Sequence, residues 1–67
     1  MTNAQKAFRA QLKAALAEHR KQRDSYAARV ERYAEVAPDG GANAEWLAMH
    51  ERMIAEIEAK LAEMAGK

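Results

Sequence analysis

Cysteine is absent from this sequence of 67 residues, proline occurs once, and only three glycines are present. Without cysteine there is no disulfide framework, no thiol nucleophile and no thiolate ligand for a metal. Because proline and glycine are the main interrupters of helices, most of the chain can be helical without a break. We therefore expect long helices, separated where the single proline, Pro38, and two of the glycines lie together.

Large apolar side chains are also scarce. Hydrophobic residues make up 49% of the chain, but 17 of the 33 are alanine. Chains below roughly 70–80 residues seldom obtain more than ~3–5 kcal/mol from a single core. Self-association is the expected remedy, so the first predicted partner is a second copy of the chain. The longest apolar run, residues 14–17, is far below the ~20 residues of a membrane span, and no secretory signal is visible. We expect a cytoplasmic protein without a membrane partner.

Two helices are predicted on either side of the Pro38 segment. Thr2 and Gln5 have the spacing of a capping box, which predicts a first helix over residues 3–36. The loop covers residues 37–43, and Asn43 is the expected cap of a second helix over residues 44–65. The predicted fold is all-α: one domain, residues 1–67, forming an antiparallel two-helix hairpin that dimerises into a four-helix bundle or coiled coil.

Both helices carry an apolar stripe at the spacing of a helix that packs against a partner. In the second helix the steps alternate between three and four residues, as in a heptad repeat. The candidate core and dimer residues are Phe8, Leu12, Leu16, Val30, Leu47, Ile54, Ile57, Leu61 and Met64.

With these helix bounds, the residue numbers of any two residues that face each other across the hairpin add up to about 80. Leu16 is therefore expected opposite Met64. The two histidines, His19 and His50, then lie about 16 Å apart along the hairpin, too far to act together. Roughly the first dozen residues extend beyond the second helix, an overhang of about 18 Å. Because the overhang carries Phe8 and Leu12, this register favours a homodimer in which the second subunit covers it.

The middle of the first helix, residues 18–25, contains no apolar side chain, and His19 and Arg23 occupy the stripe there. One interpretation is a polar layer that fixes register and subunit number. The other is a polar recognition patch. We expect His19 to face solvent, because its predicted neighbours on the second helix include no carboxylate.

Tyr26, Tyr33 and Trp46 are expected to gather at the loop end of the hairpin, with Arg29 one turn before Tyr33. They either close the core at that end or form an exposed anchor for a protein partner, since aromatic residues and arginine dominate interface hot spots. The candidate partner-binding residues are therefore Tyr26, Arg29, Tyr33, Trp46, His19 and Arg23.

The net charge of +1 divides unevenly, with +4 in residues 1–36 and −3 in residues 37–67. Two oppositely charged helices favour each other. Within the first helix, Lys6, Arg9, Lys13 and Arg20 recur near helical spacing. They form either a solvated face or a stripe that tracks nucleic-acid phosphates, and no aromatic side chain is interleaved to stack on bases.

Catalytic and metal-binding patterns are missing. His50-Glu51-Arg52-Met53-Ile54 begins like a zinc-protease helix, but Ile54 stands where the second histidine is required. Gly40-Gly41 follows no predicted strand and precedes no phosphate-loop lysine. We expect no enzyme activity, no cofactor and no metal.

In layout, the predicted hairpin resembles small phage-encoded hairpin dimers that bind host regulators, such as the anti-quorum-sensing protein that also blocks a pilus motor. It is also similar to the plasmid copy-number protein that binds paired RNA loops as a four-helix dimer, and to secretion co-chaperones of this size. The resemblance implies a phage-derived dimer that binds a host protein, such as a transcriptional regulator, and modulates or inhibits it. The alternatives are a dimer that binds RNA and a structural assembly component.

Overall fold

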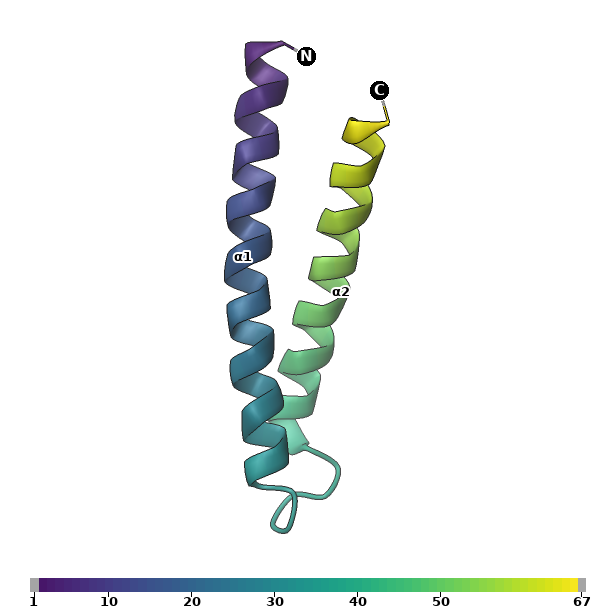
Figure 1. Ribbon diagram of the computed structural model, residues 1–67. Helices are drawn as coiled ribbons and strands as arrows, with labels where there is room; N and C mark the ends of the chain where they lie inside the picture. Colours follow the sequence, from purple (N-terminus) through teal and green to yellow (C-terminus); the bar gives the residue numbers. More distant parts are fainter. Residues whose placement is uncertain (1, 67) are drawn as a thin grey trace.

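The protein is a hairpin of two α-helices, seen in a computed structural model that describes residues 2–66. Helix α1 covers Asn3–Arg32 and α2 covers Gly41–Ala65, and no strand occurs among the described residues. The helices pack side by side, with both chain ends at the same end of the hairpin (Figure 1). The molecule is elongated, measuring 51 × 16 × 13 Å. These observations confirm the predicted all-α, antiparallel two-helix hairpin.

The start of α1 is fixed by the predicted capping box. The Gln5 backbone N–H donates a hydrogen bond to Thr2 Oγ1 at 3.1 Å, and the Thr2 backbone N–H donates to Gln5 Oε1 at 2.8 Å. Each side chain thus satisfies a backbone donor that has no partner within the helix. The prediction that the helix begins at Asn3 is confirmed.

The end of α1 was predicted wrongly. The helix ends at Arg32, four residues before the predicted Val36, and Tyr33 departs from helical geometry with φ −105° and ψ 19°. The chain then continues as tight turns, with the Val36 N–H donating to the Tyr33 carbonyl at 3.1 Å. Pro38 prevents a helix from continuing past Ala37, but the exit at Tyr33 comes earlier and belongs to the turns that close the loop.

The start of α2 also differs from the prediction. The helix begins at Gly41, three residues early, and Asn43 lies inside its first turn rather than capping it. Gly40 is the N-cap residue, with φ 81°, and Gly41 has φ 54°, so the glycines supply the left-handed backbone that the turn requires. Asp39 Oδ1 accepts a hydrogen bond from the Gly41 N–H at 3.1 Å. The positive end of the helix dipole stabilises this negatively charged carboxylate.

The two corrected ends change the register of the hairpin. Because α1 ends four residues early and α2 begins three residues early, facing positions shift by about seven residues, one heptad. The same apolar stripes of α1 and α2 pack together, but each residue contacts a different partner from the one predicted. Leu16 clusters with Ile54 and Ile57 instead of facing Met64. The overhang of α1 is correspondingly shorter than predicted, although α1 still extends beyond the end of α2 (Figure 1).

The core between the helices is thin. Leu16, Ile54 and Ile57 are its buried apolar residues, and no described side chain falls below 2% exposure. The partly buried residues Leu12 and Leu61 pack against this cluster. Of the other predicted core residues, Val30, Leu47 and Met64 are half-buried and Phe8 is 44% exposed. The hairpin alone therefore leaves much of its apolar stripe in water.

Within residues 2–66, neither helix is both long enough and apolar enough to cross a membrane.

Candidate functional site

A cluster of ring side chains lies between the two helices, from the middle of the hairpin toward the loop. Helix α1 contributes His19 and Tyr26, seven residues apart, and α2 contributes Trp46 and His50, four residues apart. These spacings place both members of each pair on the same face of a helix. The four rings form a continuous chain of contacts, which we call the ring cluster.

The two histidines meet at the inner end of the ring cluster. Nδ1 of His19 lies 2.9 Å from Nδ1 of His50, and the ring centroids are 5.1 Å apart. One nitrogen carries the hydrogen and donates, and the other accepts. This contact contradicts the predicted separation of about 16 Å, which followed from the wrong register. It also contradicts the expectation that His19 faces solvent, because His19 is half-buried and His50 is buried at 9% exposure.

Tyr26 connects the histidines to the surface. Its ring stacks on His50, with centroids 5.6 Å apart and planes 18° from parallel, and on Trp46, with centroids 6.3 Å apart and planes 17° from parallel. The Arg29 guanidinium carbon lies 5.0 Å from the centre of the Tyr26 ring, at cation–π distance. Trp46 is 50% exposed, so the outer end of the ring cluster is open to solvent.

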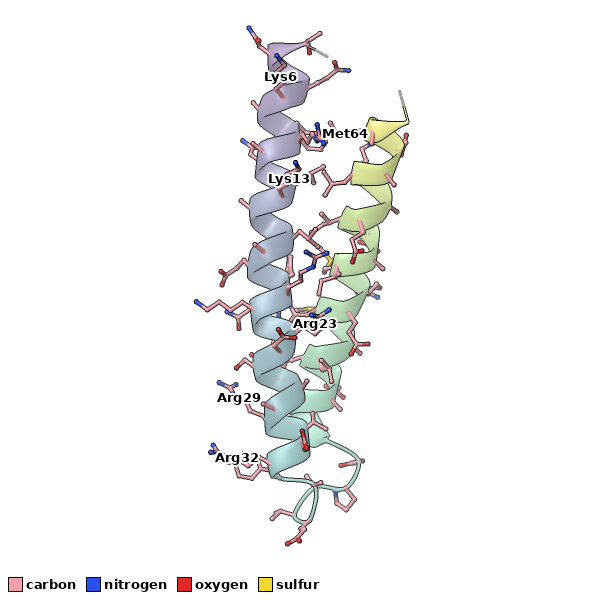
Figure 2. All side chains as sticks on the ribbon, in the orientation of Figure 1. Lys6, Lys13, Arg23, Arg29, Arg32 and Met64 are labelled. Atoms are coloured by element: carbon pink, nitrogen blue, oxygen red, sulfur yellow. The ribbon has the colours of Figure 1, made fainter. Side chains whose placement is uncertain are left out.

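The charged neighbours of the ring cluster are engaged with carboxylates. Arg23 Nη2 lies 3.0 Å from Asp24 Oδ1, and Arg23 Nε donates to the same oxygen at 3.1 Å. Arg20 Nη2 approaches Glu58 Oε2 at 4.0 Å, which joins α1 to α2. Figure 2 shows Arg23 projecting toward α2, whereas Arg29 and Arg32 project from the opposite side of α1. Partly exposed pairs of this kind contribute about 0–1 kcal/mol each.

The structure brings together most of the candidate partner-binding residues but not all of them. Tyr26, Arg29, Trp46 and His19 belong to one set of contacts, and Arg23 is half-buried on the same helix. Tyr33 caps the end of α1, 49% exposed, and makes no ring contact among the described residues. His50, which sequence reasoning left out, lies at the centre of the ring cluster. Its position on the α2 stripe was visible in the sequence, and only the register hid its partner.

The four cations of the predicted basic stripe on α1 differ in exposure and in partners. Lys6 and Lys13 are exposed, Arg9 is half-buried, and Arg20 leans toward Glu58 of α2. Their spacing places all four cations on one side of α1, but Arg9 is half-buried and Arg20 lies beside Glu58, so they offer phosphates a weaker track than their spacing suggested.

Comparison of the chain with protein-family models, with curated proteins and with solved structures finds no match in any of the three. Function is therefore argued from the chain's own residues.

Proposed function

We propose that this chain is a non-enzymatic, homodimeric binding protein that binds another protein through Tyr26, Arg29 and Trp46 and modulates the activity of that partner. The observation that carries the proposal is the arrangement of Trp46. This large aromatic side chain is half-exposed, yet it is held parallel to the Tyr26 ring.

The composition of this surface favours a protein partner. Tryptophan, tyrosine and arginine are the residues most enriched at interface hot spots. Here the three are adjacent, with Trp46 and Arg29 both in contact with the Tyr26 ring. Each group restrains its neighbour before any partner arrives, so less side-chain entropy is lost on binding.

The charge on the outer side of α1, away from α2, indicates a second feature of the partner (Figure 2). A shallow hollow on α1 is lined by Ser25, Ala28, Arg29 and Arg32. Two guanidinium groups one turn apart favour carboxylates, which arginine can bind with two parallel hydrogen bonds. A partner that contacts Trp46 and also reaches this outer side of α1 would present an apolar side chain to Trp46 and acidic side chains to the arginines.

The thin core supports the dimer. Three buried apolar residues are few for a chain of 67 residues that has no disulfide. Phe8, Leu12, Leu61 and Met64 lie toward the open end of the hairpin, exposed or half-buried. A second copy packed against this end would bury them and complete a four-helix arrangement. The aromatic surface near the loop would stay free for the partner.

A capture experiment with matched variants tests the proposed function. Tagged protein is incubated with a nuclease-treated bacterial lysate, and bound proteins are quantified by mass spectrometry for wild type, Trp46→Ala and Tyr33→Ala. Both variants remove a half-exposed aromatic ring, but only Trp46 belongs to the ring cluster. We expect Trp46→Ala to reduce capture of a specific partner at least tenfold, and Tyr33→Ala to leave it within twofold.

Equal loss in the two variants would indicate a general effect of surface apolarity and would contradict the proposal. Capture that survives in Trp46→Ala, or that depends on nucleic acid in a sample without nuclease, would also contradict it. Circular dichroism of each variant provides the check that both helices remain folded.

A further inference from the structure

The two histidines are the only histidines of the chain, and their Nδ1 atoms are aimed at one another across the helix interface. His50 is also the one polar residue among the buried residues of 2–66. A single hydrogen bond between two imidazoles contributes only modestly to stability. Two converging imidazole nitrogens can do more than this, because neutral imidazole is the commonest side-chain ligand for metal ions.

The separation of the two nitrogens indicates the class of ion. Metal–imidazole bonds of ~2.0–2.1 Å that end on nitrogens 2.9 Å apart enclose an angle of about 90°. Right angles between neighbouring ligands are the geometry of square-planar or tetragonal Cu²⁺ and Ni²⁺. Tetrahedral Zn²⁺ would need the nitrogens roughly 3.3–3.4 Å apart, which requires the rings to separate.

The geometry points to a metal site that bridges the two helices: His19 and His50 chelate a divalent copper- or nickel-class ion through their Nδ1 atoms. Binding displaces the hydrogen that the two nitrogens share. No group of three or more His, Cys, Asp or Glu residues gathers within residues 2–66, so water fills the remaining positions. Such a site is exchangeable rather than closed.

The electrostatic surroundings permit a cation at this point. Arg20, Lys21 and Arg23 are the cationic residues of α1 nearest to His19 in sequence, and Arg20 and Arg23 have carboxylates beside them, Glu58 and Asp24 respectively. Glu18 accepts a hydrogen bond from Gln22 Nε2 at 3.1 Å, and Glu51 follows His50 directly on α2. Arg52 lies two residues after His50 on α2, so the four cations Arg20, Lys21, Arg23 and Arg52 are balanced by the four carboxylates Glu18, Asp24, Glu51 and Glu58.

The ion would act as a clip between α1 and α2. The two ligands are 31 residues apart in the chain, so coordination closes a long loop across the hairpin. It would thus supply the staple that a small chain without cysteine lacks. This role is separate from the binding of a protein partner at the outer end of the ring cluster.

Copper binding to the full chain tests the site directly. The N-terminus is acetylated to remove the terminal amine as a competing ligand, and Cu²⁺ is titrated at pH 7.5. Isothermal titration calorimetry is expected to give one ion per chain, and pulsed electron paramagnetic resonance is expected to count two coordinated imidazoles. Ni²⁺ in excess should raise the melting temperature, because a ligand that binds only the folded state stabilises it.

Two variants complete the test. His19→Gln should weaken Cu²⁺ binding at least tenfold and leave one imidazole in the resonance spectrum, and it should abolish the effect of Ni²⁺ on melting. Glu51→Gln, which removes a carboxylate beside His50 but keeps both rings, should bind Cu²⁺ within twofold of wild type. One imidazole in the wild type, one ion per two chains, or unchanged binding in His19→Gln would each overturn the proposal. The count of imidazoles in the wild type is independent of whether any variant folds.

Discussion

Nδ1 of His19 and Nδ1 of His50 lie 2.9 Å apart, although 31 residues separate them in the chain. This contact is a side-chain hydrogen bond that joins α1 to α2. It needs one nitrogen as donor and one as acceptor, so each ring depends on the other for its partner.

The first prediction is that the contact between the two histidines stabilises the hairpin. His50 is buried, so removing the His19 ring leaves the Nδ1 atom of His50 without its partner. A buried polar group without a partner costs about 1–3 kcal/mol, so the free energy of unfolding should fall by that amount.

Urea unfolding in metal-free buffer at pH 7.5 measures this effect. We expect His19→Ala to unfold at a clearly lower urea concentration than wild type, because His50 then has no imidazole opposite it. Equal stability of the two proteins would show that the contact does not control stability.

The second prediction concerns the thin core. Ile54 is 5% exposed, the lowest value among the core residues, so Ile54→Ala should cost about 2 kcal/mol, near the lower end of the range for large-to-small core substitutions. Val36→Ala is the matched control, since Val36 is 84% exposed and should change stability by less than ~0.5 kcal/mol. The denaturant midpoints of both variants measure the two losses of stability. Similar losses in Ile54→Ala and Val36→Ala would contradict the assignment of Ile54 to the core.

The third prediction concerns the glycines of the turn. A Cβ on Gly40, which has φ 81°, would lie 2.5 Å from the Cβ of Ala44, whereas a Cβ on Gly41, with φ 54°, would be 4.0 Å from the nearest side chain. Both alanine variants incur the left-handed backbone cost of roughly 1–2 kcal/mol, but only Gly40→Ala adds a steric clash. We expect Gly40→Ala to be the less stable in thermal melts. The reverse order would mean that the turn can rearrange.

Local patterns in the sequence were sufficient for the fold. The capping box of Thr2 and Gln5 depends on residues three apart, and the heptad stripe of α2 depends on spacing within one helix, so both could be predicted. The helix ends at the loop were harder to predict. Tyr33 can be accommodated inside a helix and Asn43 can cap one, so both residues suit their predicted positions. Which residue ends a helix there depends on how the loop closes.

The candidate site was predicted less completely, because it depends on register. Tyr26 and Trp46 were expected to gather near the loop, and an error of seven residues still leaves both rings in that region. The contact between His19 and His50 is sensitive to the same error, since a hydrogen bond needs its two atoms within about 3 Å. Stripes identify which faces meet, but the loop decides which residues face each other.

The fourth prediction separates a protein partner from RNA. If the α1 cations bind phosphates, Lys6→Gln with Lys13→Gln should weaken binding and reduce the salt slope by roughly 0.7–0.9 per lost contact. We expect instead no RNA affinity tighter than about micromolar at physiological salt, because a half-buried Arg9 and an Arg20 beside Glu58 leave few cations to neutralise phosphates. Filter binding with structured and single-stranded RNA measures this. A nanomolar complex that the double variant abolishes would favour the RNA-binding alternative.

The fifth prediction is the dimer. Light scattering after size exclusion should give close to twice 7.5 kDa at micromolar concentration, and thermal melting should shift upward with concentration. Phe8 is 44% exposed near the open end of the hairpin, so Phe8→Glu would place a charge in the proposed subunit interface and should weaken the dimer at least tenfold. Val36→Glu, which adds the same charge in the loop, should leave the mass unchanged. If the wild type is a monomer that melts cooperatively at a temperature independent of concentration, the three buried residues are enough to stabilise the hairpin without a second subunit.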